Sequence, residues 1–180
     1  IQADIESISS AGCHATTVIT SLTTQNTNKV LDVIPQKPEP FRNQIRLILE
    51  DMDIVACKIG MIGSIKLLEV IVNELAGLNI PVVLDPVMSS TTGKQFSGDD
   101  ICKKMLTSLL PLTTLITPNC IEATLLTQKD NLTAAANTLL SHDADSVLIT
   151  GTHAETHEVI NTFYTKQGSP IEYHWERLPE

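Results

Sequence analysis

The sequence predicts an α/β fold with a mostly parallel central sheet, helices on both faces and a C-terminal antiparallel hairpin. Short apolar runs alternate with segments of helical periodicity along most of the chain, which is typical of repeated strand–helix units. Two of the apolar runs end at polar side chains, Asp85 and Asn119. Near the end of the chain, two β-prone runs flank Gly168, as in a hairpin. The 180 residues, 42% of them hydrophobic, are enough for one domain.

The first half of the chain alternates helices and strands. Isoleucines three and four residues apart precede Gly12, so the chain is expected to begin inside a helix. Residues 15–22 are rich in Thr, Val and Ile and predict a strand, with residues 23–27 as its exit loop. Two prolines then precede a stretch of helical spacing, which predicts a helix at 41–52, and the apolar run after it predicts a strand at 54–59. A second stretch of helical spacing predicts a helix at 67–77, and a second apolar run predicts a strand at 81–85.

The second half begins with a polar segment that contains glycine, residues 88–98. It is long enough to be a functional loop, and we expect it to close over a substrate. The alternation then resumes, with predictions of a helix at 99–110, a strand at 112–117, a helical pair at 121–140, a strand at 146–150 and a hairpin at 159–164 and 171–175.

Composition excludes several classes of function. The net charge of −9, from 21 acidic and 12 basic residues, argues against nucleic acid, which is bound mainly through clustered Lys and Arg. The four cysteines form no C-x-x-C pair, so neither a zinc knuckle nor a disulfide framework is indicated, and reduced thiols in the cytoplasm fit best. No apolar run approaches the roughly 20 residues that cross a bilayer. We expect a soluble protein with no membrane partner.

The residues at the predicted strand exits form a chemically coherent set, because ligands of such sheets bind at the carboxyl ends of the strands. The set combines an amide, apolar side chains, two acids, an Asn and a Gly-containing turn: Gln25, Met61, Asp85, Val87, Asn119, Glu122, Thr150 and Gly151. It suits a flat heteroaromatic ligand beside a phosphate chain bound to Mg²⁺, with Asp85 and Glu122 as the metal-side acids.

Simpler interpretations of the same residues stay open. Gln25 suits an ordinary polar loop, and Met61 suits an ordinary core position. Asp85 precedes Pro86 and can simply end a strand, while Glu122 is a favourable first-turn residue for a helix. Lys58 is either structural or a distant phosphate contact.

Seven motifs in order along the chain carry a resemblance to a known family. They are Ile1-Gln-Ala-Asp4, Val18-Ile-Thr20, Thr24-Gln-Asn-Thr27, Lys58-Ile-Gly-Met61, Val83-Leu-Asp-Pro-Val-Met88, Leu109-Leu-Pro-Leu112 and Ile116-Thr-Pro-Asn119 with Glu122. Together they resemble the hydroxymethylpyrimidine/phosphomethylpyrimidine kinases of thiamine biosynthesis, within the ribokinase-like superfamily. The resemblance implies a ribokinase-like three-layer sandwich, a small pyrimidine substrate, ATP and Mg²⁺ as cofactors, and a homodimer.

The resemblance also implies roles for individual residues. Asp4, Gln25, Met61 and Val87 look like the pyrimidine-binding residues. Glu122 matches the N-x-x-E acid that acts on Mg²⁺, and Asp85 looks like a carboxylate near both the metal and the phosphates. Asn119, Thr150 and Gly151 are similar to residues on the ATP and phosphate side. A pyridoxine/pyridoxal kinase is the nearest alternative, because related enzymes share the fold and a flat substrate with a hydroxymethyl group.

The chain departs from the family pattern in three places. Thr150 begins Thr-Gly-Thr-His where the family usually has Lys-Gly-Gly-His, so a cation near the phosphates is missing. The family's Gly-Thr-Gly-Cys anion hole and catalytic base are expected beyond Glu180, and its first strand before Ile1. We therefore predict a single kinase domain over residues 1–180 that lacks the first strand and the anion-hole segment, with no catalytic base among its residues. A catalytically weak, pyrimidine-binding regulatory domain is the alternative of a different class.

Overall fold

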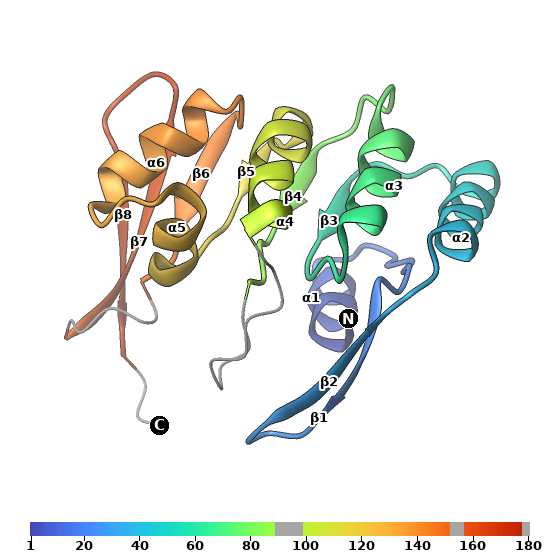
Figure 1. The fold of residues 1–180 in the computed structure, drawn as a ribbon. Helices are drawn as coiled ribbons and strands as arrows, with labels where there is room; N and C mark the ends of the chain where they lie inside the picture. Colours follow the sequence, from blue (N-terminus) through green and yellow to red (C-terminus); the bar gives the residue numbers. More distant parts are fainter. Residues whose placement is uncertain (89–98, 152–156, 178–180) are drawn as a thin grey trace.

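The computed structural model describes residues 1–88, 99–151 and 157–177. The described residues form a six-stranded sheet in the order β3-β4-β5-β6-β7-β8 and a separate two-stranded sheet, β1-β2 (Figure 1). None of the helices in these three ranges has the length and apolar character needed to cross a lipid bilayer.

The large sheet is parallel in its first part and antiparallel at its end. The strands β3 (Cys57–Ile59), β4 (Val82–Leu84), β5 (Leu115–Ile116) and β6 (Ser146–Ile149) pair in parallel. The strands β7 (Glu158–Thr165) and β8 (Ile171–Glu176) then add an antiparallel hairpin. The predicted mostly parallel sheet and its C-terminal hairpin are confirmed. The four parallel strands end at the same edge of the sheet, so the residues that follow them share that edge.

The helices lie largely where their periodicity predicts them: α1 (Gln2–Ser10), α2 (Pro38–Asp51), α3 (Ile65–Leu75), α4 (Asp99–Lys104), α5 (Cys120–Thr127) and α6 (Leu132–Ser141). Local chemistry sets their beginnings. Pro38 stands in the first turn of α2, and the Ser64 side chain accepts a hydrogen bond from the backbone N–H of Leu67 at the start of α3. The helix predicted at 99–110 changes character after Lys104.

That change gives a π-helical turn, Met105–Leu109, followed by a 3₁₀ turn, Leu110–Leu112. Pro111 lacks the backbone N–H that would continue an α-helix, so the chain leaves this conformation just before the fifth strand.

The core lies on one face of the large sheet. Alternate strand residues such as Val82, Leu84, Ile116 and Val147 are buried there against the helices, in one cluster with the fully buried Leu67, Leu68, Leu109 and Leu139. The residues between them, including Lys58 and Val83, face the other side and are more exposed. Helix α1 reaches this second face through Asp4 and buries none of its own residues.

The prediction for residues 15–27 is wrong. Residues 15–20 form no strand, whereas residues 21–22 of the predicted strand and residues 23–25 of the predicted exit loop form β1 (Ser21–Gln25), which pairs antiparallel with β2 (Val30–Pro35). The side-chain oxygen of Asn26 accepts hydrogen bonds from the backbone N–H groups of Asn28 and Lys29 and so closes the turn. A strand needs a neighbour, and the neighbour available to this polar stretch is the run at 30–35. The predicted loop at 88–98 lies outside the described residues from residue 89 onward.

Candidate functional site

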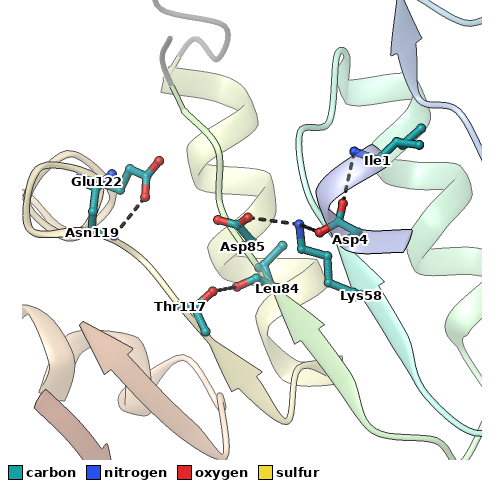
Figure 2. A network of polar contacts seen from close by, with 8 residues as sticks. All are labelled: Ile1, Asp4, Lys58, Leu84, Asp85, Thr117, Asn119 and Glu122. Atoms are coloured by element: carbon teal, nitrogen blue, oxygen red, sulfur yellow. Dashed lines mark hydrogen bonds and ion pairs between the residues drawn. The ribbon is translucent and has the colours of Figure 1, made fainter. Parts of the chain in front are cut away.

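Two predicted acids, Asp4 and Asp85, meet at Lys58. The ammonium nitrogen of Lys58 lies 3.0 Å from Asp4 Oδ1 and 3.0 Å from Asp85 Oδ2 (Figure 2). Lys58 is the middle residue of β3 and stands opposite Val83 of β4, so Asp85, two residues further along, lies on the same face. The backbone N–H of Asp85 donates to the Ile59 carbonyl oxygen at 2.8 Å, which fixes the end of β4.

The charges of this cluster support one another. Partial burial favours the neutral form of Asp4, but hydrogen bonding and attraction from Lys58 oppose it, and the pKa of Asp4 is lowered. Burial likewise opposes the charge on Lys58, yet its hydrogen bonds to Asp4 and Asp85 raise the pKa of the ammonium group. The three side chains are 31–39% exposed, so the cluster lies at the surface of the sheet edge.

A second cluster forms at the end of β5. Asn119 is the N-cap of α5, and its side-chain oxygen accepts the backbone N–H of Glu122 at 2.9 Å. In return, Glu122 Oε2 accepts the backbone N–H of Asn119 at 2.9 Å, which completes a capping box (Figure 2). Glu122 is only 7% exposed. The N-x-x-E sequence therefore has a structural role as a helix cap, and the buried acid also benefits from the helix dipole.

Thr150 and Gly151 join this second cluster through the backbone. Thr150 pairs with Asn119 in a parallel bridge, and its N–H donates to the Pro118 carbonyl oxygen at 2.9 Å. The N–H of Gly151 donates to the side-chain oxygen of Asn161 on β7 at 3.1 Å. A Cβ at position 151 would overlap the carbonyl oxygen of Ile160, so glycine is required by the close approach of β7.

The apolar residues of the predicted site follow the ends of β3 and β4. Met61 and Val87 are half-buried. The carbonyl oxygen of Met61 accepts a hydrogen bond from Thr20 Oγ1 at 2.7 Å, and the N–H of Val87 donates to the Asp85 carbonyl oxygen at 2.8 Å. Both residues therefore have backbones held by hydrogen bonds just after the ends of β3 and β4.

Gln25 stands apart from the strand exits. It is the last residue of β1, is exposed, and pairs through its backbone with Val30 across an irregularity in the register. The expectation that Gln25 follows a strand of the parallel sheet is wrong, because the small hairpin forms its own sheet. Its part in pyrimidine binding stays a prediction, in which the β1-β2 hairpin brings the Gln25 side chain to the ring.

The donor chemistry of the edge fits Mg²⁺. Within the described ranges, no group of three or more His, Cys, Asp or Glu side chains is arranged to hold a metal. Mg²⁺ does not need such a group, since it keeps several waters and takes one or two carboxylates together with phosphate oxygens. Asp85 and Glu122 supply hard carboxylate oxygens from the ends of neighbouring strands, β4 and β5.

Sequence reasoning missed two positions. The sequence leaves Lys58 open between two roles, although a lysine inside a short apolar strand, two residues before Gly60, is a signal for an acidic partner. Asn161, whose side-chain oxygen accepts the N–H of Gly151, is predicted from the sequence only as part of the hairpin. A polar side chain in the middle of a strand that adjoins the core would have been the signal for it.

Comparison with known proteins gives one consistent result. The family described as Phosphomethylpyrimidine kinase matches residues 1–180. A hydroxymethylpyrimidine/phosphomethylpyrimidine kinase of Rhizobium meliloti is 31% identical over 170 residues, which cover 91% of this chain and 64% of that protein. The chain spans slightly less than two thirds of the length of such curated relatives.

Solved structures share the same fold. The crystal structure of a phosphomethylpyrimidine kinase from Clostridium difficile is similar with a TM-score of 0.83 and 30% identity, over 97% of this chain and 77% of that one. An ADP complex of Bacillus subtilis pyridoxal kinase gives a TM-score of 0.89 at 24% identity, over 100% of this chain and 71% of that one. At that identity the second likeness concerns the fold alone.

Proposed function

Because the chain belongs to the phosphomethylpyrimidine kinase family, we propose that it is part of an ATP-dependent kinase of thiamine biosynthesis. The substrate is 4-amino-5-hydroxymethyl-2-methylpyrimidine, whose hydroxymethyl group is phosphorylated, and the resulting monophosphate is the second substrate. The family match over residues 1–180 carries this proposal. It is supported by acids at the exits of adjacent strands, which is where a magnesium-nucleotide site is expected in a parallel sheet.

The pyrimidine binds on the side of the edge formed by the ends of β3 and β4. Met61 and Val87 form apolar walls for the ring, and Asp4 accepts hydrogen bonds from its amino and hydroxymethyl side. Gln25 pairs with the ring from the hairpin. The ion pair with Lys58 at 3.0 Å supports its part, since an ionised carboxylate is a strong hydrogen-bond acceptor.

The nucleotide phosphates bind on the side formed by the ends of β4, β5 and β6. Asn119, Thr150 and Gly151 line the phosphates, and Asp85 and Glu122 hold Mg²⁺. When bound, Mg²⁺ neutralises charge on the phosphate oxygens. Thr150 offers a hydroxyl where the family usually has an ammonium group. Alignment of the phosphates by the surrounding residues therefore contributes more to catalysis in this chain than a positive charge does.

We further propose a cytoplasmic homodimer. The hairpin supports a partner surface, because three of its apolar residues are half or more exposed, Leu22 at 53%, Leu31 at 58% and Ile34 at 50%. Size-exclusion chromatography with light scattering tests the dimer, and a monomer at micromolar concentration would contradict it.

The activity is tested with the purified full-length protein, Mg-ATP and the pyrimidine alcohol. Mass spectrometry should detect the monophosphate and then the diphosphate, with stoichiometric formation of ADP. Tight pyrimidine binding without product would instead support the regulatory binding domain, for which Thr150 is the motivating residue.

Pyridoxal kinase is the second candidate, since the Bacillus subtilis pyridoxal kinase shares the fold and the choice between the two therefore depends on the substrate. Both enzymes would transfer phosphate to a hydroxymethyl group on a flat ring. Measuring kcat/KM for the pyrimidine and for pyridoxal with one enzyme preparation separates them. A higher value for pyridoxal would overturn the pyrimidine assignment.

A further inference from the structure

Lys58 connects two acids that have different parts in the proposed function. Asp4 belongs to the pyrimidine side and Asp85 to the metal side, yet one ammonium group contacts both, each at 3.0 Å. The contact engages one oxygen of each carboxylate, Oδ1 of Asp4 and Oδ2 of Asp85. The two acids come from α1 and from the end of β4, which are far apart in sequence, and Lys58 lies between them on β3.

The position of the ammonium group is defined by its surroundings. Lys58 is 31% exposed, so its side chain is largely held against the protein. A Cβ at Gly60 would lie only 3.2 Å from the Lys58 ammonium nitrogen, which shows how closely the side chain passes over the end of its own strand. Charge-assisted contacts from two directions restrict the side chain further.

Without this cation, the two acids would lose their arrangement. Two carboxylates beside one ammonium leave the cluster with one net negative charge, whereas removal of the ammonium would leave two uncompensated charges in partly buried positions. The two carboxylates would then repel each other and turn toward solvent, because no shared cation would hold them together. That reorientation would not keep Asp4 and Asp85 in the geometry that the proposed function needs.

We propose that Lys58 is a positioning residue that holds the carboxylates of Asp4 and Asp85 in one arrangement, so that the pyrimidine side and the metal side of the site are aligned together. This inference rests on the proposed kinase function. It differs from two simpler roles for Lys58, an anchor that only ties α1 to the sheet and a direct contact with phosphate. An anchor would affect folding alone, and a phosphate contact would act independently of the two acids.

The test replaces Lys58 in the full protein and measures binding as well as turnover. Lys58→Met removes the charge while keeping the length, and Lys58→Arg keeps the charge. Lys166→Met is the matched control, because Lys166 forms an exposed pair with Asp143 at 3.7 Å, beside the end of β7 that pairs with the start of β6. Calorimetry measures pyrimidine binding without nucleotide, steady-state kinetics give kcat and KM for both substrates, and circular dichroism confirms folding.

Lys58→Met should weaken pyrimidine binding and lower kcat/KM by about tenfold to a hundredfold, as loss of an orienting partner does at comparable sites. Lys58→Arg should recover most of the pyrimidine affinity and of kcat/KM, and Lys166→Met should match the wild type in both quantities. Adding Lys58→Met to Asp4→Asn or Asp85→Asn should cost much less than it does alone, because the cation acts through those acids. If Lys58→Met does not fold, Lys58→Gln, which keeps a hydrogen-bond donor, is measured in its place.

The outcomes separate the inference from the function beneath it. A wild-type protein that neither binds nor phosphorylates the pyrimidine overturns the proposed function and the inference with it. An active wild type together with a neutral Lys58 variant within twofold of it in binding and turnover overturns the inference alone. Fold-changes that multiply independently in the double variants also overturn it, since they would assign Lys58 a separate contact with the substrate.

Discussion

Glu122→Gln tests whether the buried acid at the start of α5 does more than cap the helix. Glutamine has the same length and keeps a side-chain oxygen that can accept the Asn119 N–H, now made at 2.9 Å by the carboxylate. The capping box should therefore persist. What disappears is the negative charge, which the helix cap does not strictly require but a Mg²⁺ site does.

The expected cost in stability is small. A hydrogen bond to a charged group contributes roughly 1.5–3 kcal/mol and a neutral one roughly 0.5–1.5 kcal/mol, so the exchange costs about 1 kcal/mol. Loss of the favourable interaction with the helix dipole adds about 0.3–1 kcal/mol. Glu122 is only 7% exposed, so relief from burying a charge offsets part of this. We expect the free energy of unfolding to fall by about 1 kcal/mol and Tm by about 2–4 °C.

The expected cost in activity is larger. Loss of a metal-side carboxylate should lower kcat/KM by about tenfold to a hundredfold and raise the Mg²⁺ concentration needed for half-maximal rate. Asn131→Ala is the matched control, because Asn131 caps α6 by accepting the Ala134 N–H at 2.9 Å. It should lose about 1 kcal/mol of stability and no activity.

Chemical denaturation and steady-state kinetics at varied Mg²⁺ measure the two effects separately. A Glu122→Gln protein with wild-type kcat and an unchanged Mg²⁺ dependence would refute the metal role and leave Glu122 as a cap alone. A loss of stability well above 3 kcal/mol would contradict the energy estimate, since it would mean that the fold itself depends on the charge.

Three further predictions concern stability and titration. Gly151→Ala should destabilise the protein by about 1–3 kcal/mol, because the added Cβ overlaps the backbone of Ile160; an unchanged Tm would count against this close approach. Leu68→Ala should cost about 2–5 kcal/mol in chemical denaturation, since Leu68 is 0% exposed within the core, and a cost below 1 kcal/mol would contradict its placement. Glu158→Gln should lower the pKa of His174 measured by NMR titration, because the hydrogen bond that the ring donates to that carboxylate at 2.9 Å favours the protonated ring and raises its pKa; an unchanged titration would disprove the contact.

The large sheet was predictable because its signals are local. An apolar run such as the one that contains Leu84 has to be buried, and the helix that follows has its own periodicity, so each unit can be recognised alone. The hairpin β1-β2 was not predictable in this way. Residues 23–25 are polar, and they belong to a strand only because residues 30–35 return beside them. That pairing is a property of two segments together and leaves little trace in either one.

In the candidate site, too, local sequence patterns predict some residues, whereas other contacts depend on how separate elements pack. Asp85 and Glu122 follow apolar runs, so their places at the sheet edge could be predicted from the order of the chain. The contact between Asp4 and Lys58 depends on how α1 rests against β3, which no local pattern specifies. The N-x-x-E sequence matches the pattern of a capping box, which the structure confirms, whereas its proposed part in metal binding depends on the family resemblance.

The bridge between Asn119 and Thr150 has a consequence for the thermodynamics of ligand binding. Ordering the backbone of one residue costs roughly 1–2 kcal/mol of conformational entropy. Because this bridge and the hydrogen bond from Thr150 to Pro118 already fix the ends of β5 and β6 in the folded chain, that cost falls on folding and not on association. A phosphate chain that docks against these two strand ends should therefore meet a rigid cradle and bind without a slow rearrangement of the backbone there.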